Sequence, residues 1–60
     1  MNRDEALLVW ANAGIIEGQY DAETGEVRGA FQVAESLGLE KETGEHKMFV
    51  TGYLVGLDKV

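Results

Sequence analysis

The sequence predicts an all-α fold with three short helices, and two recurring patterns carry that prediction. The first is a glycine that follows an apolar stretch and precedes another apolar residue, as Ala-Gly-Ile at 13–15, Leu-Gly-Leu at 37–39 and Val-Gly-Leu at 55–57. A left-handed glycine followed by an apolar residue is typical of a helix C-terminus. The chain also lacks proline, so no position excludes a helix. Three such endings indicate three helices.

The second pattern is a set of helix starts that agrees with these ends. Asn2 and Glu5 have the spacing of a capping box, in which the first side chain caps the backbone of the second. Thr-Gly-Glu at 24–26 and at 43–45 places a threonine and a glutamate where an N-cap and a first turn are expected. The expected helices span about 3–13, 26–37 and 45–55 of a single domain, 1–60, with an ordered connection over 14–25.

Two segments leave an alternative open. The connection over 14–25 is long for a helical protein, and residues 15–20 could pair with 26–31 as a β-hairpin. The segment 47–55 is rich in residues that favour strands, although its apolar residues recur at helical spacing. The all-α fold is therefore the prediction, and an α+β fold with a hairpin over 15–31 is the alternative.

The first and third predicted helices are apolar on nearly every face, which a chain of 60 residues cannot bury by itself. The chain has no cysteine, so disulfides cannot supply the missing stability. We therefore expect a homodimer in which these two helices meet their symmetry mates. The predicted interface consists of Trp10, Met48, Gly52, Val55 and Gly56. The predicted centre of the apolar cluster consists of Trp10, Phe49, Tyr53 and Leu54.

No residue pattern predicts catalysis, a cofactor or a metal site. His46 beside Glu45 could form a general base with an orienting carboxylate, but no nucleophile is placed next to the pair. Asp21 and Glu23 alternate as in an EF-hand loop, yet valine and glutamine stand at the later ligand positions, 27 and 32. We expect a protein that is not an enzyme and binds neither a cofactor nor a metal.

The charge of the chain favours a protein partner. Eleven acidic residues against five basic ones give a net charge of −6, which disfavours binding to nucleic acid. The predicted acidic surface consists of Asp21, Glu23, Glu26, Glu40, Glu42 and Glu45. The longest apolar runs are far shorter than a membrane span, and the N-terminus does not read as a signal peptide. We expect a cytoplasmic, non-catalytic interaction module, such as a small phage or bacterial regulator or inhibitor that binds another protein.

Residues 33–43 suggest a second function. Val-Ala-Glu-Ser-Leu-Gly-Leu at 33–39, followed by Glu-Lys-Glu-Thr, resembles the first helix and the turn of helix-turn-helix DNA-binding domains. The resemblance implies a recognition helix after the turn and a DNA-binding regulator as the alternative function. The segment at that place, 45–49, is not basic as a recognition helix usually is, so the interaction module remains the prediction.

Overall fold

The computed structural model describes residues 2–59, and within that range it contains three α-helices and no strand. Helix α1 spans Arg3–Thr24, α2 spans Ala30–Ser36 and α3 spans Gly44–Asp58. The predicted all-α class and the number of helices are confirmed. The alternative hairpin over 15–31 is not supported, because its first half lies within α1.

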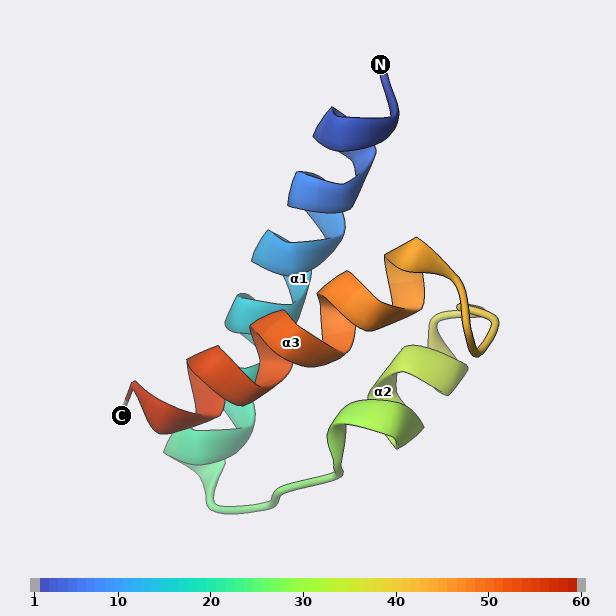
Figure 1. The fold of residues 1–60 in the computed structure, drawn as a ribbon. Helices are drawn as coiled ribbons and strands as arrows, with labels where there is room; N and C mark the ends of the chain where they lie inside the picture. The colour runs from blue at the N-terminus through green and yellow to red at the C-terminus, as the bar shows by residue number, and fades with distance from the viewer. Residues whose placement is uncertain (1, 60) are drawn as a thin grey trace.

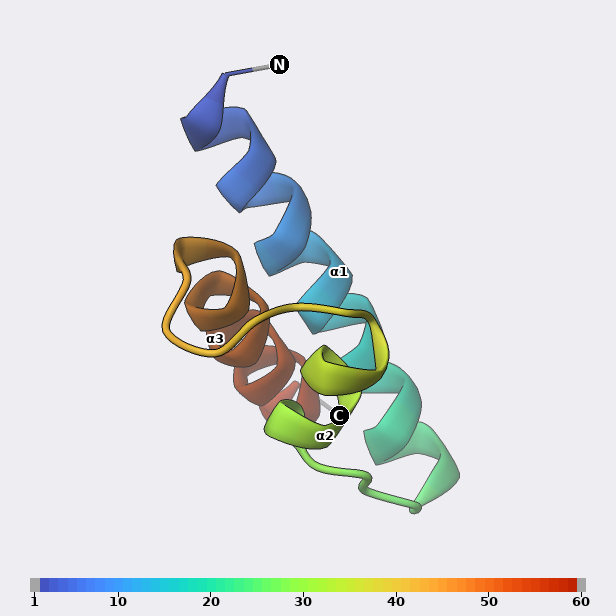
Figure 2. The ribbon, with the colours of Figure 1, turned by 90° about the vertical axis from the view of Figure 1, so that its right-hand side faces the viewer.

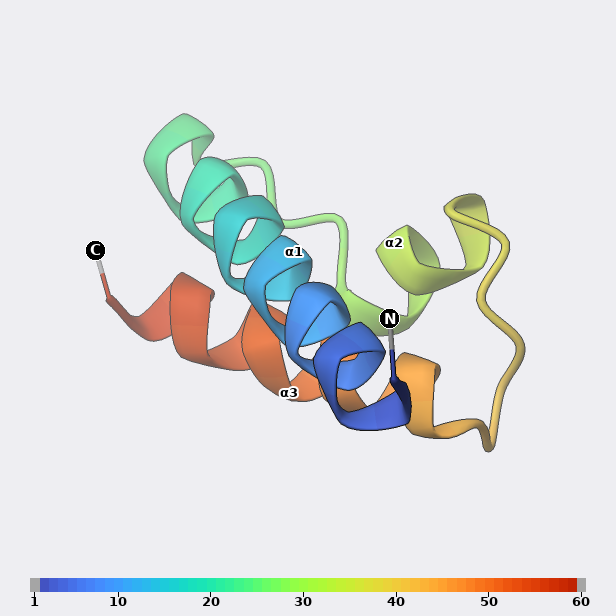
Figure 3. The same cartoon turned by 90° about the horizontal axis from the view of Figure 1, so that it is seen from above.

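Helices α1 and α3 cross each other in extensive contact, and α2 packs mainly on α3 (Figure 1). The first turns of α1 extend past the level of α3 in both side views (Figure 2). Seen from above, α2 lies beside the crossed pair rather than between its two members (Figure 3). The molecule is consequently elongated, measuring 34 × 18 × 13 Å.

Helix α1 continues to Thr24, so its predicted end near residue 13 is wrong, as is the predicted connection over 14–25. Gly14 lies inside the helix, and the residue that ends it is Gly25, which has a φ of +78°. The N–H of Gly25 donates to the carbonyl of Asp21 at 3.0 Å. The apolar-Gly-apolar pattern at 13–15 therefore lies inside a helix, whereas the glycine that ends α1 stands between Thr24 and Glu26.

The predicted N-caps of the first and third helices are confirmed. The side chain of Asn2 accepts a hydrogen bond from the N–H of Glu5 at 2.8 Å. The hydroxyl of Thr43 accepts one from the N–H of His46 at 3.1 Å. Each cap satisfies a backbone donor that has no partner within its helix. Thr24, in contrast, belongs to the last turn of α1, so α2 does not begin near residue 26 but at Ala30.

The predicted glycine ending is confirmed for α2 and wrong for α3. Gly38 has a φ of +83°, and its N–H donates to Glu35 while that of Leu39 donates to Ala34, at 3.0 and 3.1 Å. This pair of hydrogen bonds is the Schellman arrangement. Helix α3 instead runs through Gly56 and ends at Asp58.

The core is small and draws on all three helices. Its fully buried apolar residues are Val33, Ala34, Phe49 and Tyr53. Trp10 is half-buried and meets Phe49 edge to face, with ring centroids 6.3 Å apart. The predictions for Phe49 and Tyr53 are confirmed, whereas Leu54 is 55% exposed and was wrongly predicted to be central. Leu54 is one position beyond Tyr53 on α3, and a step of 100° turns it away from the core.

Four buried glycines allow the backbones of α1 and α3 to touch: Gly14, Gly18, Gly52 and Gly56. A Cβ on Gly52 would lie less than 3.0 Å from the carbonyl oxygen of Ala11. Gly56 faces the carbonyl of Ile15 in the same way, and the two glycines of α1 face backbone atoms of α3. Small residues four apart are a known device for close helix packing. Here both helices carry such a pair, and the two pairs pack together.

Candidate functional site

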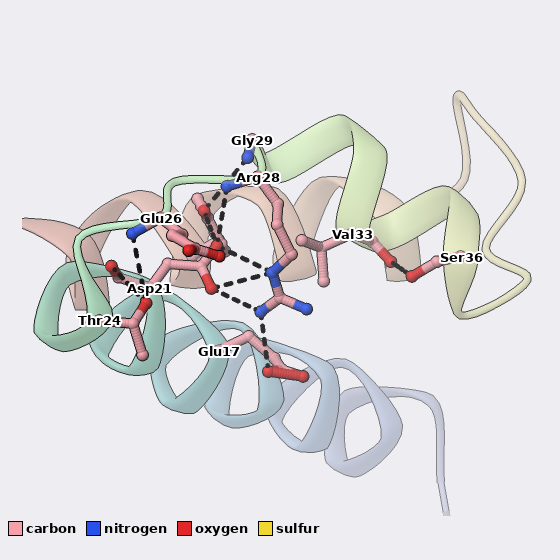
Figure 4. A network of polar contacts seen from close by, with 9 residues as sticks. Glu17, Asp21, Thr24, Glu26, Arg28, Gly29, Val33 and Ser36 are labelled. Atoms are coloured by element: carbon pink, nitrogen blue, oxygen red, sulfur yellow. Dashed lines mark hydrogen bonds and ion pairs between the residues drawn. The ribbon is translucent and has the colours of Figure 1, made fainter.

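Asp21 lies at the centre of a polar cluster where the end of α1, the connection over 25–29 and α3 come together (Figure 4). Its carboxylate is fully buried and accepts hydrogen bonds from the backbone N–H of Arg28 at 3.1 Å and from Arg28 Nε at 2.9 Å. Arg28 Nη2 lies 2.7 Å from Oδ1, and the hydroxyl of Tyr53 donates to Oδ2. The carboxylate therefore receives donors from two separate segments of the chain.

The outer members of the cluster fix the connection between α1 and α2. Arg28 Nη2 also lies 3.3 Å from a carboxylate oxygen of Glu17, and its guanidinium stacks 5.8 Å from the centre of the Tyr20 ring. The hydroxyl of Tyr53 accepts a hydrogen bond from the N–H of Gly29 at 3.3 Å. Together these contacts attach the connection to both long helices.

The electrostatics of the cluster keep Asp21 ionised and Tyr53 neutral near pH 7. The hydrogen bonds from the Arg28 side chain lower the pKa of Asp21 from 3.8 to about 2, and they outweigh the opposing effect of burial. Burial raises the pKa of Tyr53, and its hydrogen bond to Asp21 raises it further. No buried side-chain nitrogen or oxygen in residues 2–59 lacks a hydrogen-bond partner. A carboxylate whose lone pairs are already engaged is poorly suited to proton transfer, so the cluster holds the fold together.

Asp21 was predicted to lie on the acidic surface and is instead buried. Its two partners lie 7 and 32 residues away along the chain, and nothing in the local sequence pairs them. The other acidic residues of that prediction lie at the surface. Glu23, Glu26, Glu40 and Glu42 are exposed, and Glu45 is partly buried.

The five residues of the predicted interface occupy different environments. Gly52 and Gly56 are buried against α1 of the same chain, and Trp10 packs on Phe49. Met48 is partly buried, and Val55 is 44% exposed on α3. The glycine pair therefore makes a contact within the chain, in the place where a contact with a second copy was expected. The sequence does contain a sign of this contact. Gly14 and Gly18, which were assigned to a helix end and a connection, are four residues apart, as Gly52 and Gly56 are.

The outer face of α1, formed by Val9, Ile16 and Tyr20, carries large apolar side chains that are each more than half exposed. Because these positions lie on the side of the helix opposite Gly14 and Gly18, packing against α3 leaves them uncovered. Leu8 is also more than half exposed and precedes this face. The segment 6–16, which contains Val9 and Ile16, has no charged residue.

A groove of about 560 Å³ lies at the N-terminus of α3. Its lining includes the apolar residues Phe31 and Val50 and the charged residues Lys41, Glu42 and Lys47. His46 also lines it, and its ring meets Phe31 edge to face with centroids 5.0 Å apart. His46, which the sequence suggested as a candidate general base, therefore lies at this groove. Two residues with a hydroxyl also line it, Thr43, which caps α3, and Thr51.

The chain matches no protein-family model, and neither curated proteins nor solved structures show significant similarity to it. None of the helices in the described part of the chain combines the length and the apolar character needed to cross a membrane.

Proposed function

We propose that the protein is a non-catalytic interaction module that pairs with a second copy of itself through the outer face of α1. The observation that carries the proposal is the exposure of Val9, Ile16 and Tyr20, each of which places more than half of its surface in water. A contiguous row of large apolar side chains on a soluble domain usually marks a contact with another protein.

The chemistry of this face suits a symmetric pair. In a two-fold dimer the same surface is used by both copies, so it must not bring like charges together. The chain carries a net charge of −6, yet the segment 6–16 of α1 is uncharged. Two copies can therefore meet along this part of the helix while their acidic residues stay apart.

The acidic residues then remain available for a different protein in the cytoplasm. Glu23 and Glu26 lie in and after the last turn of α1, and Glu40 and Glu42 lie in the connection between α2 and α3. All four are exposed, which favours a partner with a basic surface and fast, salt-sensitive association. A small regulator or inhibitor that acts by covering such a surface fits this arrangement.

Sedimentation equilibrium on Ile16→Glu tests the self-association, with Val27→Glu as a matched control. Both residues are β-branched and more than half exposed, but Val27 lies in the connection before α2. Each buried isoleucine contributes about 1.5 kcal/mol, and a symmetric dimer contains it twice. Ile16→Glu should therefore weaken the dimer about a hundredfold or more, since 1.4 kcal/mol is a factor of ten, while Val27→Glu leaves it unchanged.

A wild-type chain that remains monomeric at roughly millimolar concentration would refute the self-association. Equal weakening by both substitutions would refute the assignment of the interface to α1. Retention on duplex DNA that weakens steeply with added salt would instead support the helix-turn-helix alternative.

A further inference from the structure

We propose that Asn12 is the residue by which the outer face of α1 recognises a second copy of the chain. Two α1 helices lie antiparallel across a two-fold axis, and the side-chain amides of the two Asn12 residues form hydrogen bonds with each other on that axis. The arrangement rests on the proposed self-association and goes beyond it, because it names the residue that makes the pairing specific and the relative direction of the two helices.

Asn12 lies within a row of exposed side chains on α1. Leu8, Asn12 and Ile16 follow each other at intervals of four residues and therefore lie along one side of the helix. Tyr20 continues the row by another turn. All four side chains are exposed, and the three apolar ones each place more than half of their surface in water. The amide thus has a large apolar side chain one turn before it and another one turn after it.

The amide of Asn12 differs chemically from everything around it. In the uncharged segment 6–16, only Asn12 and the indole of Trp10 have side chains that form hydrogen bonds. An amide both donates and accepts, so two amides that face each other satisfy one another. A single asparagine in an apolar contact between helices is known to determine which helices pair and in which register. A second copy of α1 supplies the matching amide, whereas a purely apolar partner would leave it unsatisfied.

A two-fold axis beside Asn12 makes the row complementary to itself. The axis brings each Asn12 against its own copy. When the two helices run antiparallel, positions equally far before and after residue 12 lie opposite each other, so Leu8 faces Ile16 of the second copy. The two large apolar side chains next to the amide pair then cover each other on both sides of the axis, and each helix buries the same residues.

The acidic residues of α1 favour the antiparallel direction. In a parallel pair the exposed side chains of Glu5 and Glu23 would each meet their own copy, and like charges that face each other oppose association. In the antiparallel pair Glu5 lies opposite Gln19, and Asp4 lies opposite Tyr20. An amide and a phenol can both donate a hydrogen bond to a carboxylate. The N-terminus of each helix also lies beside the C-terminus of the other, where the helix dipoles attract.

Asn12 also selects one register among several. If the antiparallel pair slides by one helical turn, Asn12 faces Leu8 or Ile16 of the second copy, and its amide is covered by an apolar side chain. A covered amide without a partner disfavours such a register about tenfold or more. The apolar residues of the row make no comparable distinction, since they can pack on one another in each of these registers.

Disulfide cross-linking of the full chain tests the arrangement, because the chain has no cysteine of its own. Leu8→Cys and ¹⁵N-labelled Ile16→Cys are mixed and oxidised with diamide, at a concentration at which sedimentation equilibrium shows a dimer. The label lets mass spectrometry separate the mixed disulfide from the two symmetric ones. A disulfide needs Cα atoms about 4.4–6.8 Å apart, whereas positions 8 and 16 lie about 12 Å apart along the helix. The mixed product should therefore exceed each symmetric product about tenfold or more.

Asn12→Leu, introduced into both cysteine variants, tests the role of the amide. It keeps the size of the side chain and should leave the chain dimeric. The rate of mixed cross-linking should fall about threefold, because the registers one turn to either side become comparable with the original one. Gln19→Leu is the matched control, since it removes the other side-chain amide of α1 at a distance from the axis. It should change the rate less than about twofold.

Each contrary result overturns a stated part of the arrangement. Symmetric disulfides at positions 8 and 16 with little mixed product would refute the antiparallel direction, and the absence of all three products from a dimeric chain would refute the contact along the row. A cross-linking rate that Asn12→Leu leaves unchanged, or that Gln19→Leu lowers equally, would refute the role of Asn12. A chain that sediments as a monomer would refute the self-association and the arrangement together, so sedimentation distinguishes the two failures.

Discussion

The close contact of α1 with α3 makes a direct prediction for Gly52→Ala. A Cβ at this position would lie less than 3.0 Å from the carbonyl oxygen of Ala11, and both groups belong to helix backbones that cannot move aside alone. The two helices must therefore separate until ordinary contact, at about 3.4 Å or more, is restored. Because Gly56 faces Ile15 on the same interface, the separation loosens that contact as well.

The magnitude follows from two opposing effects. Alanine is a better helix former than glycine by about 1 kcal/mol, which favours the variant. Overpacking of a tight interface costs about 1–3 kcal/mol or more, and a gap of 0.5–1 Å removes a quarter to a half of each dispersion contact across it. Since the contact joins the two main helices along their length, we expect a cost above that range, about 4 kcal/mol, and therefore a net loss of about 3 kcal/mol after the gain in helix propensity. A chain of this size has a total stability of roughly 3–9 kcal/mol, so little of it would remain.

Thermal and urea unfolding followed by circular dichroism measure this loss. A decrease of about 3 kcal/mol corresponds to a fall in Tm of roughly 12 °C or more in a domain this small. Gly44→Ala is the matched control, because it makes the same change at a helical position. There the added Cβ would meet only the ends of the Arg3 and Leu7 side chains, at 3.1 and 3.2 Å, which can move.

The comparison of the two variants decides whether the reasoning is right. Gly44→Ala should unfold within about 1 kcal/mol of the wild type. If Gly52→Ala were equally stable, with an unchanged dependence on urea, the backbone contact between α1 and α3 would not exist in solution. Agreement between the two probes of unfolding is needed for either conclusion.

Three further predictions concern the polar cluster and the connection before α3. Tyr53→Phe removes a buried hydroxyl that donates to a carboxylate, and should lower the free energy of unfolding by about 2 kcal/mol in urea melts. The pKa of Asp21 is lowered to about 2 in the folded chain, so its stabilising effect is complete above about pH 4 and is lost as the pH falls towards 2. Melts between pH 5 and 2 should show this loss in the wild type, and a flat profile in that range in Asp21→Asn would confirm its source. Glu42 has a φ of +67°, so Glu42→Gly should stabilise by about 0.5–1 kcal/mol, whereas Glu40→Gly, without a positive φ, should not. An equal effect of these two glycine substitutions would show that backbone strain at Glu42 is absent.

The helical class and several helix ends could be predicted from the sequence because they depend on neighbours within about four residues. Asn2 and Thr43 cap α1 and α3 as expected, and Gly38 closes α2 with the expected hydrogen bonds. Capping requires only a short side chain next to the first free N–H groups, and a glycine ending requires only a left-handed residue. Both requirements are visible in the printed sequence.

The candidate sites could be predicted only in part. Sequence reasoning considered His46 as a base, but it could not bring Arg3 from α1 and Lys41 from a connection to the same helix end. It likewise placed Asp21 on the surface. The donors that allow this carboxylate to be buried come from Arg28 and Tyr53, which lie 7 and 32 residues away along the chain. Both arrangements depend on contacts between segments that are distant along the chain.

The glycines show most clearly where the sequence was sufficient and where it was not. The same apolar-Gly-apolar pattern occurs around Gly14, Gly38 and Gly56. By itself it shows only that no side chain covers the backbone at these positions. At Gly38 this freedom is used for a left-handed turn, whereas Gly14 and Gly56 remain helical and admit the backbone of the opposite helix. Which use prevails depends on whether another helix packs at that point, because burial against a neighbour stabilises a continuous helix more than a glycine destabilises it. The sequence determined the helical class and the N-caps of α1 and α3, and the packing of α1 on α3 decided where these two helices end.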